Sequence, residues 1–313
     1  MSSSSHNISV KIKEYALQLG FDACGFCKAE KAEDEEKHFN QWLQNGYNAD
    51  MEYLAKNSEK RYNPQLLVDQ AQSIICVALN YYPSKKQDEN NPQFAYYAYG
   101  KDYHKVVKNM LEELYKYIQS LVADVTGRVF CDTAPVLERY WAAKAGLGFI
   151  GKNSLLIIPR KGSFFFLGEV IVNIKLDYDK PLNISCGSCS KCIESCPTQA
   201  IEKSYVLNSN NCISYQTIEN RHEIKSEIIN CLNNNFYGCD ICQKACPWNK
   251  FAQPNTTVQF EIKEELLNIT FDELKNLTVE KYQDLFKDSA IKRARYEGLM
   301  RNIKALEYSK KMK

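Results

Sequence analysis

Eight cysteines in the second half of the chain form two related groups. The first group has the pattern C-x2-C-x2-C-x3-C, is followed directly by a proline, and consists of Cys186, Cys189, Cys192 and Cys196. The second group repeats the pattern in shorter form after a lone upstream cysteine, and consists of Cys212, Cys239, Cys242 and Cys246. The longer pattern is the spacing that wraps a four-iron cubane. Eight thiolates suffice for two 4Fe–4S clusters, so the sequence predicts a protein that transfers electrons.

The cysteine before the proline decides how the ligands divide between the clusters. In two-cluster ferredoxins this cysteine points away from its own motif and serves the other cluster. We therefore expect one cluster on Cys186, Cys189, Cys192 and Cys246. The second cluster would then be held by Cys196, Cys212, Cys239 and Cys242.

Zinc and disulfides are the alternative uses of these cysteines. Zinc usually takes four ligands in two Cys-x2-Cys pairs, which fits the longer motif poorly. Disulfides need an oxidising compartment. Residues 1–7 lack the pattern of a secretory signal, and no apolar stretch approaches the ~18 residues that span a bilayer. We therefore expect a cytoplasmic protein in a reducing environment, without membrane association.

Three of the remaining cysteines lie in apolar segments. Cys24 and Cys27 form a C-x-x-C pair that is also found in thioredoxin-like redox sites. Because the pair lies in a segment predicted as a buried strand, two small buried thiols are the alternative. Cys76 lies in an apolar run and is predicted to belong to the core.

The composition is that of a globular protein with room for two domains. The chain has 313 residues, 44% hydrophobic and 25% charged, and a net charge of +2, which gives no strong polyanion signal. Periodicity predicts helices at 8–19, 35–43, 51–56, 104–122 and 135–145. It predicts strands at 21–26, 73–81, 128–131, 155–158 and 163–174. This alternation indicates an α/β (α+β) domain over 1–178, followed by a ferredoxin-like domain over 179–255 and a short helical region over 256–313.

Asp132 is the candidate acid. It follows a predicted strand among apolar neighbours, where a desolvated carboxyl could keep a proton near neutral pH and act as a general acid. The alternative role is that of a helix N-cap.

A glycine-rich segment follows the helix predicted after Asp132. Residues 146–154 (GLGFIGKNS) have neither the residue order of a phosphate-binding loop nor the strand–helix context of a dinucleotide fingerprint. A tight turn is one interpretation, and a turn lying close under a large flat cofactor is the other.

Taken together, seven segments closely resemble epoxyqueuosine reductases, which catalyse the last step of queuosine synthesis in tRNA. They are 100–104, 132–139, 145–154, 162–169, 186–197, 212–215 and 237–249. The resemblance covers residues 8–252, with the motifs in order.

The resemblance implies a cobalamin enzyme related in fold to reductive dehalogenases, with a ferredoxin-like domain that feeds electrons to the corrin. It implies reduction of epoxyqueuosine to queuosine by attack of cob(I)alamin on the epoxide. Asp132 matches the family's proton donor. Motif positions suggest corrin contacts at Arg61, Tyr99, Lys152, Ser214 and Asp240.

The implied partners are a tRNA anticodon stem-loop with a queuosine-type wobble base and an electron donor that the sequence does not identify. We expect the enzyme to be a monomer. Residues 289–313 carry eight Lys and Arg against two Glu, which favours salt-dependent phosphate binding, although a solvated terminus has the same composition. Arg221 and His222 are further candidate tRNA contacts, and Tyr215 lies near the cluster motif.

Longer family members continue into helical repeats, whereas residues 262–306 predict only short helices at 271–276, 279–286 and 291–306. Another corrinoid reductase, resembling a dehalogenase, is the nearest alternative function. A two-cluster electron carrier leaves residues 1–178 without a role. A tRNA-binding module without catalytic chemistry leaves the eight thiolates without a role.

Overall fold

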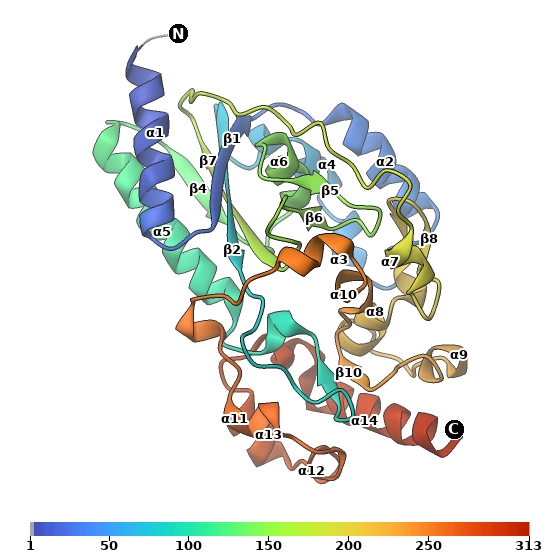
Figure 1. The fold of residues 1–313 in the computed structure, drawn as a ribbon. Coiled ribbons are helices and arrows are strands. Elements are labelled where there is room, and N and C mark those ends of the chain that lie inside the picture. Colours follow the sequence, from blue (N-terminus) through green and yellow to red (C-terminus); the bar gives the residue numbers. More distant parts are fainter. Residues whose placement is uncertain (1–2, 313) are drawn as a thin grey trace.

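A four-stranded sheet forms the centre of the molecule. The computed structural model describes residues 3–312 and orders the strands β1 (Ala23–Lys28), β2 (Ser73–Asn80), β7 (Phe165–Val172) and β4 (Gly127–Phe130). All three strand pairs are antiparallel (Figure 1). Alternating helices and strands usually indicate parallel pairing. The structure therefore has the α+β form of the predicted class.

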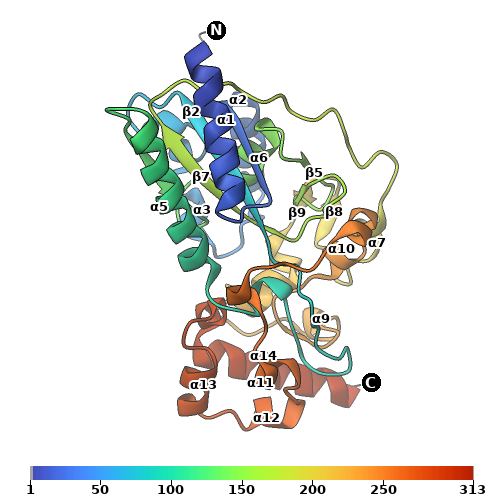
Figure 2. The same cartoon turned by 60° about the vertical axis from the view of Figure 1, so that its left-hand side comes forward.

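Two long helices cover one face of this sheet. α1 (Ser3–Gln18) packs on β1, and α5 (Tyr103–Leu121) packs on β4 and β7, side by side with α1 (Figures 1 and 2). The buried side of α5 consists of Val107, Leu111, Leu114 and Ile118. Their spacing of three and four residues places them on one helical face. Each such side chain contributes roughly 1.5–3 kcal/mol by burial.

Shorter elements cover the opposite face. They are α2 (Glu33–Gln44), α3 (Glu52–Ala55), α4 (Ser58–Tyr62), α6 (Glu138–Lys144) and the hairpin β5 (Phe149–Ile150)–β6 (Leu156–Ile157). Of these, α6 packs on β1, β2 and β7. β2 serves both faces, since Ile75, Val77 and Leu79 belong to one core and Ile74, Cys76 and Ala78 to the second. This alternation is the period of two that strands impose.

The structure resolves the two interpretations of Cys24 and Cys27. Both are free thiols in β1, three residues apart. Such residues point to opposite faces of a strand at a separation of roughly 10 Å, which no disulfide can bridge. Burial raises the pKa of the Cys24 thiol to about 12, and Cys76 is fully buried. These cysteines therefore act as small hydrophobic side chains.

The segment with the cluster motifs is built from short elements. They are α7 (Lys191–Glu194), β8 (Ile201–Lys203), β9 (Val206–Leu207), α8 (Ile213–Ile218), α9 (Ser226–Ile229), β10 (Asn235–Tyr237) and α10 (Ile241–Lys244). β10 pairs in parallel with β3 (Gln93–Phe94), which joins this segment to the loop region after β2. The Asp240 carboxylate also accepts a hydrogen bond from the Tyr96 backbone N–H at 2.7 Å.

Four helices gather at the end opposite the N-terminus: α11 (Glu264–Leu267), α12 (Phe271–Lys275), α13 (Val279–Leu285) and α14 (Arg295–Met312) (Figure 2). The three predicted helices are present, although α14 starts at Arg295, after a 3-10 turn at Ala290–Ala294, and its 18 residues extend past the predicted end at 306. Asn302 of α14 is fully buried and donates from Nδ2 to the carbonyls of Thr217 and Phe236, both at 2.8 Å.

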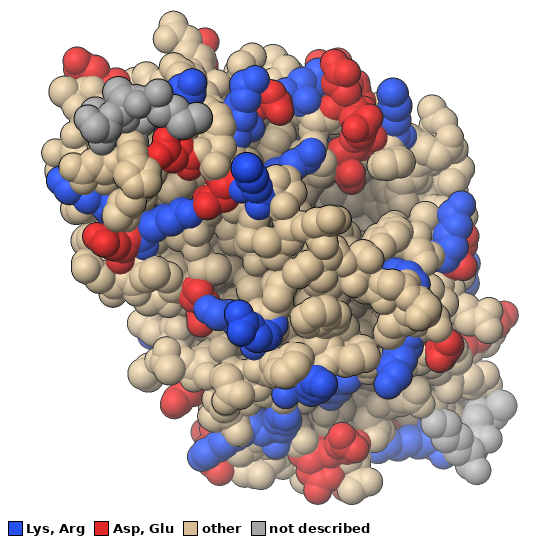
Figure 3. Space-filling model, turned by 45° about the horizontal axis from the view of Figure 1, so that its top comes forward, with Lys and Arg blue, Asp and Glu red and all other residues tan. Residues whose placement is uncertain are grey.

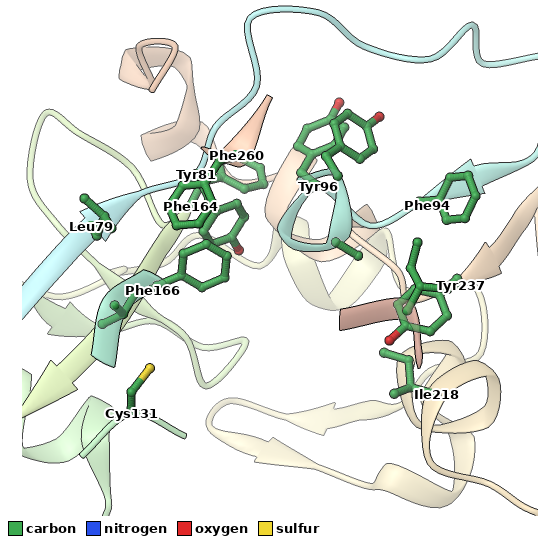
Figure 4. Close-up of a cluster of buried hydrophobic side chains, with 14 of the residues drawn as sticks. Leu79, Tyr81, Phe94, Tyr96, Cys131, Phe164, Phe166, Ile218, Tyr237 and Phe260 are labelled. Atoms are coloured by element: carbon green, nitrogen blue, oxygen red, sulfur yellow. The ribbon is translucent and has the colours of Figure 1, made fainter. Parts of the chain in front are cut away.

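One aromatic cluster connects all three regions of the chain (Figure 4). Phe166 of β7 contacts Tyr81 at 4.5 Å and Phe260 at 4.9 Å between ring centroids, and Phe94 contacts Phe236 at 4.3 Å. The boundaries at 178/179 and 255/256 therefore stay a prediction. Among residues 3–312, no helix has the length and apolar character needed to span a bilayer.

Candidate active site

Asp132 lies on the loop that follows β4. Its backbone has φ +56°, a left-handed conformation that Asp tolerates better than most residues. α6 begins six residues later, at Glu138, so the N-cap alternative for Asp132 is wrong. The side chain is 55% exposed, and its Oδ2 accepts hydrogen bonds from the Tyr103 hydroxyl and from His104 Nε2, the latter at 3.2 Å.

The start of α5 positions both of these donors. The Asp102 side chain caps the helix by accepting from the His104 backbone N–H, and its Oδ1 lies 2.7 Å from His104 Nδ1. The Tyr103 ring stacks on Phe166 with 4.2 Å between ring centroids. Asp102, His104 and Asp132 therefore form one hydrogen-bonded chain that ends at an exposed carboxylate.

This chain decides where the proton resides. Burial lowers the pKa of His104, but its hydrogen bonds to Asp102 and Asp132 outweigh burial and raise the pKa to about 9. Burial raises the pKa of Asp132, but the hydrogen bonds from His104 and Tyr103 hold it below its usual value. The expectation that Asp132 itself keeps a proton near neutral pH is therefore wrong in this arrangement. The His104–Asp132 pair holds the proton, on the imidazole.

Two further acids lie behind Asp132. The Glu138 carboxylate accepts a hydrogen bond from the Asp132 backbone N–H, and burial together with the Asp132 charge raises the pKa of Glu138 to about 8. Glu169 of β7 is fully buried, and neither carboxylate oxygen has a hydrogen-bond partner within residues 3–312. Neither residue was predicted as a site residue from the sequence. The available signal was one acid in the middle of the apolar strand FFLGEVIV.

A cavity of about 130 Å³ brings together the four cysteines predicted for the first cluster. Cys186, Cys189, Cys192 and Cys246 line it together with Lys152, Asn153, Ile157, Pro247 and Trp248. The last cysteine of the second motif thus lies with the first motif, as the ferredoxin pattern requires. That these thiolates bind iron stays a prediction.

The other four cysteines also interact with one another. Burial raises the pKa of the Cys242 thiol to about 12, with added contributions from Cys212 and Cys196. Burial likewise raises the pKa of the Cys239 thiol, and electrostatic interactions with Cys212 and Cys242 raise it further. Packing of α7 against α10 brings the two motifs together. These are the four residues predicted for the second cluster.

The donor set fits a polynuclear cluster better than zinc. In the described part of the chain, no three His, Cys, Asp or Glu side chains converge closely enough for a single metal ion, whose ligand distances are about 2.0–2.3 Å. The first four cysteines instead surround a cavity. Asn153 is 5% exposed, and its buried Nδ2 has no partner among the residues described. An N–H donor of this kind suits a cluster sulfur.

Three of the predicted corrin contacts lie near these features. Arg61 is 8% exposed, donates to the carbonyls of Tyr53 and Leu54 at 3.1 Å, and interacts electrostatically with Asp132. Lys152 lines the cysteine cavity and donates to the Gly187 carbonyl at 2.7 Å. Ser214 is half-buried in α8, two residues after Cys212.

The other two predicted contacts are used inside the protein. Tyr99 is buried, and its hydroxyl accepts from the Gln87 backbone N–H at 3.4 Å. Asp240 is buried against the Tyr96 backbone, and burial raises its pKa to about 6. Corrin binding by all five residues therefore stays a prediction. The accessible side chain of Asp132, which interacts electrostatically with Arg61, leaves the acid open to a large bound group.

The glycine-rich segment is explained by contacts within the protein. A Cβ on Gly148 would lie 2.3 Å from the Ile157 carbonyl oxygen, across the β5–β6 hairpin. Gly146 has φ +74°, and a Cβ there would lie 2.7 Å from the Lys180 carbonyl oxygen. The tight-turn interpretation is sufficient for both.

Several candidate tRNA contacts serve the fold. Tyr215 is buried, and its hydroxyl donates to Asp50 Oδ2 at 2.8 Å, which does not suit stacking on a base. Arg221 donates to three backbone carbonyls, whereas the His222 side chain is 78% exposed.

The basic C-terminal segment also has structural roles. Arg293 forms a two-pronged ion pair with Glu219 at 2.8 Å, and Arg301 donates to three carbonyls of residues 216–222. Lys313 lies outside the described residues. Figure 3 shows Lys and Arg interspersed with Asp and Glu around an uncharged area.

Comparison with known proteins decides the family. A family model described as "Epoxyqueuosine reductase QueG, DUF1730" matches residues 61–133, and one described as "4Fe-4S double cluster binding domain" matches residues 185–249. An epoxyqueuosine reductase of Cellulophaga algicola is 44% identical over 296 residues, covering 95% of this chain and 97% of that relative. The chain belongs to the epoxyqueuosine reductase family. The Escherichia coli family member is 38% identical over 95% of this chain and 80% of its own length.

Solved structures of epoxyqueuosine reductases confirm the predicted fold class. One, with a tRNA-Tyr epoxyqueuosine-modified stem loop, matches with TM-score 0.88 and 29% identity over 96% of this chain and 80% of that one. The Bacillus subtilis enzyme, with its catalytic Asp loop swung out of the active site, matches with TM-score 0.89 and 29% identity over 96% and 81%. The reductive dehalogenase NpRdhA, at 16% identity and TM-score 0.49, is too distant to support an argument.

Proposed function

We propose that this protein reduces epoxyqueuosine to queuosine at the wobble position of tRNA. The observation that carries the proposal is the chain Asp102–His104–Asp132, which ends at an exposed carboxylate. The same polypeptide holds two sets of four cysteines. Family members with 38–44% identity over nearly the whole chain are named for this reaction.

The reaction breaks both C–O bonds of the epoxide, forms a C=C bond and releases the oxygen as water. It needs two electrons and two protons, and side chains cannot supply the electrons. Two 4Fe–4S clusters on the eight cysteines would relay electrons from the external donor. Bound cobalamin would supply the low-potential nucleophilic centre that opens the epoxide.

The residues of this chain deliver the protons. His104 Nε2 carries a proton at neutral pH and lies 3.2 Å from Asp132 Oδ2, so the proton can pass to Asp132 and on to the departing oxygen. Asp102 holds the imidazole in this orientation. Delivery of a proton to an alkoxide by a positioned side chain accelerates such steps by roughly 10²–10⁴-fold.

The loop that carries Asp132 is the proposed moving part of the site. In the Bacillus subtilis relative, a catalytic Asp loop swings out of the active site. In this chain the Asp132 side chain accepts hydrogen bonds from Tyr103 and His104, and its backbone N–H donates to Glu138.

Binding of cofactors and partners follows from the same residues. The proposed corrin contacts are Arg61, Tyr99, Lys152, Ser214 and Asp240. The tRNA partner is an anticodon stem-loop, as in the solved complex of the relative. We place the enzyme in the cytoplasm as a monomer, with an external low-potential electron donor.

The test compares the wild-type enzyme with Asp132→Asn on tRNA that contains epoxyqueuosine, under anaerobic conditions with a reductant. We expect the variant to keep its iron, cobalamin and tRNA affinity and to lose turnover, measured by mass spectrometry of the nucleoside. Asp124→Asn is the matched control, since Asp124 is also exposed with φ +61°. Full activity of Asp132→Asn would refute the proton-delivery role. Absence of a corrin absorption band after reconstitution would favour the electron carrier.

A further inference from the structure

The loop that carries two cysteines of the first cluster is open to solvent. Gly187 lies between Cys186 and Cys189, and, apart from its chain neighbours, no atom of the described residues lies within 4 Å of a Cβ placed on it. Ser185 and Ser188, on either side of Gly187, are exposed. Because only small side chains cover this loop, another protein can come close to these cysteines.

The corresponding loop of the second cluster is enclosed. Gly238 directly precedes Cys239, and a Cβ on Gly238 would lie 2.6 Å from the Cβ of Ala95. Cys239 itself packs against the main hydrophobic core. At these two loops, a partner protein therefore has access to the first cluster and not to the second.

Aromatic contacts connect the second cluster to the active site. The Tyr97 hydroxyl donates to the hydroxyl of Tyr237, two residues before Cys239, at 3.2 Å. The Tyr97 ring also contacts the Tyr103 ring with 6.0 Å between centroids, and the Tyr103 hydroxyl donates to Asp132. The enclosed cysteines are thus the ones that lie towards the active site, which leaves the open loop as the place where electrons from outside can enter.

Basic side chains surround this open loop. Lys152 lines the cysteine cavity, and its Nζ donates to the Gly187 carbonyl at 2.7 Å. Lys191 is exposed and directly precedes Cys192. Lys250 is also exposed and lies two residues after Trp248, which lines the same cavity.

Two more basic residues belong to the turn between β6 and β7. Arg160 and Lys161 are both exposed. The turn is attached to the segment after the second motif, because Asn249 Oδ1 accepts from the Ser163 backbone N–H at 2.7 Å. We call the five basic residues around the open loop the basic rim: Lys152, Arg160, Lys161, Lys191 and Lys250.

The basic rim has little negative charge near it in the sequence and forms no ion pairs. Residues 150–161, 185–196 and 246–252 contain its five cations and one acid, Glu194, which gives these segments a net charge of +4. In the described part of the chain, every ion pair between Lys or Arg and an acid involves other residues. Positive charge without a counter-charge attracts an acidic partner and accelerates its association.

Apolar side chains are exposed beside the basic rim. Ile184 is 42% exposed and precedes the cysteine loop. Phe251 is 37% exposed, and the Lys250 Nζ lies 4.8 Å from its ring centroid. Transient complexes of redox proteins bury small areas, below about 1,200 Å². A few apolar groups with charged groups around them are the composition of such an interface.

We propose that the basic rim is the docking surface for the electron donor, and that this donor is a small redox protein with acidic residues around its own redox centre. The inference rests on the proposed function, which needs electrons from outside. In each encounter the donor loses one electron and the first cluster gains it, so two encounters supply the two electrons of the reaction. A polyanion such as tRNA is also attracted by Lys and Arg, but only an electron donor needs access to the open cysteine loop.

The test measures reduction of the clusters in the holoenzyme, without tRNA. Fully reduced flavodoxin, an acidic protein that gives up single electrons, is the probe, and reduced methyl viologen, a small cation, is the comparison. Stopped-flow absorbance follows the bleaching of the clusters. We expect the second-order rate constant with flavodoxin to fall as salt is added, because salt screens the charges. The rate constant with methyl viologen should not fall. A rate constant with flavodoxin that is independent of salt would contradict the proposal.

Charge reversal tests the residues of the basic rim. We expect the double variant Lys191→Glu and Lys250→Glu to lower the rate constant with flavodoxin on the order of 10-fold, with no loss for methyl viologen. The double variant Lys11→Glu and Lys116→Glu is the matched control, since both lysines are exposed, lie in α1 and α5, and give the same change of net charge. An equal loss in the control, or no loss in the rim variant, would overturn the proposal.

The affinity of the same variants for tRNA tests the other partner. A lower tRNA affinity with an unchanged flavodoxin rate would assign the surface to nucleic acid and overturn the proposal. If charge reversal lowers the iron content, Lys191→Gln with Lys250→Gln replaces it, and a smaller loss of rate in the same direction is expected. Failure of the proposed function is distinguishable, because it would appear as absence of queuosine formation by a wild type whose clusters flavodoxin still reduces.

Discussion

Replacing Glu169 with Met should stabilise the protein and remove part of its pH dependence. In the wild type, both carboxyl oxygens of Glu169 are buried without partners. Burying a polar group in this way costs about 1–3 kcal/mol. Met has similar length and an adaptable, apolar side chain, so it can occupy the site without this penalty.

The sign of the pH effect follows from the raised pKa of Glu169. The folded state keeps the proton, whereas the unfolded chain releases it above about pH 4.3. Stability therefore falls as pH rises above that value, by about 1.4 kcal/mol per pH unit for one proton. Between pH 5 and pH 7 this amounts to about 3 kcal/mol, which Glu169→Met should recover. The pKa values of Glu138 and His104 are also raised, so their contributions to the stability of the protein fall as pH rises. Both residues remain in the variant.

Thermal unfolding of the two holoenzymes at one scan rate measures the effect. An unfolding entropy of about 2.1 cal/mol/K per residue gives about 0.66 kcal/mol/K for 313 residues. A gain of about 2 kcal/mol at pH 5 then raises Tm by about 3 °C, and about 5 kcal/mol at pH 7 raises it by about 7 °C. Glu265→Met serves as the exposed control. Equal Tm gains at both pH values, or a loss at both, would refute the reasoning.

Three further predictions concern the clusters and the C-terminal helix. The Cys246→Ser variant should retain about four of eight iron atoms, because it loses the cluster beside Lys152. Iron analysis and electron paramagnetic resonance would detect this loss. Loss of the other cluster would contradict the assignment. Asn153→Leu should make the reduction potential of that cluster more negative, because a buried N–H donor is removed; a redox titration that shows no shift would exclude the donor role. Asn302→Leu leaves two buried carbonyls without donors and should destabilise the fold by about 2–4 kcal/mol. The loss should be visible as a lower Tm. An unchanged Tm would show that these hydrogen bonds are dispensable.

Local features were readable from the sequence. The cysteine spacing indicated a cluster because three ligands of the first cluster come from one short loop, whose geometry depends on nearby residues alone, and the shorter repeat of the motif indicated the second cluster. The apolar runs of β2 and β7 indicated buried strands because burial on both faces requires continuous apolar sequence. The periodicity of residues 104–122 predicted α5, because a helix that buries one face repeats its apolar residues every three or four positions.

Pairing and protonation were decided by the tertiary structure. The antiparallel order of the sheet depends on how distant segments meet, and helix–strand alternation does not determine it. The sequence placed Asp132 at a strand end but predicted the wrong protonation state for it. The pKa of Asp132 depends on His104 and Tyr103, which belong to another element. Glu169 becomes a buried acid without a partner only when β2, β4 and α6 pack against β7. Spacing along a chain specifies ligands, whereas a proton's position depends on electrostatics among residues that only folding brings together.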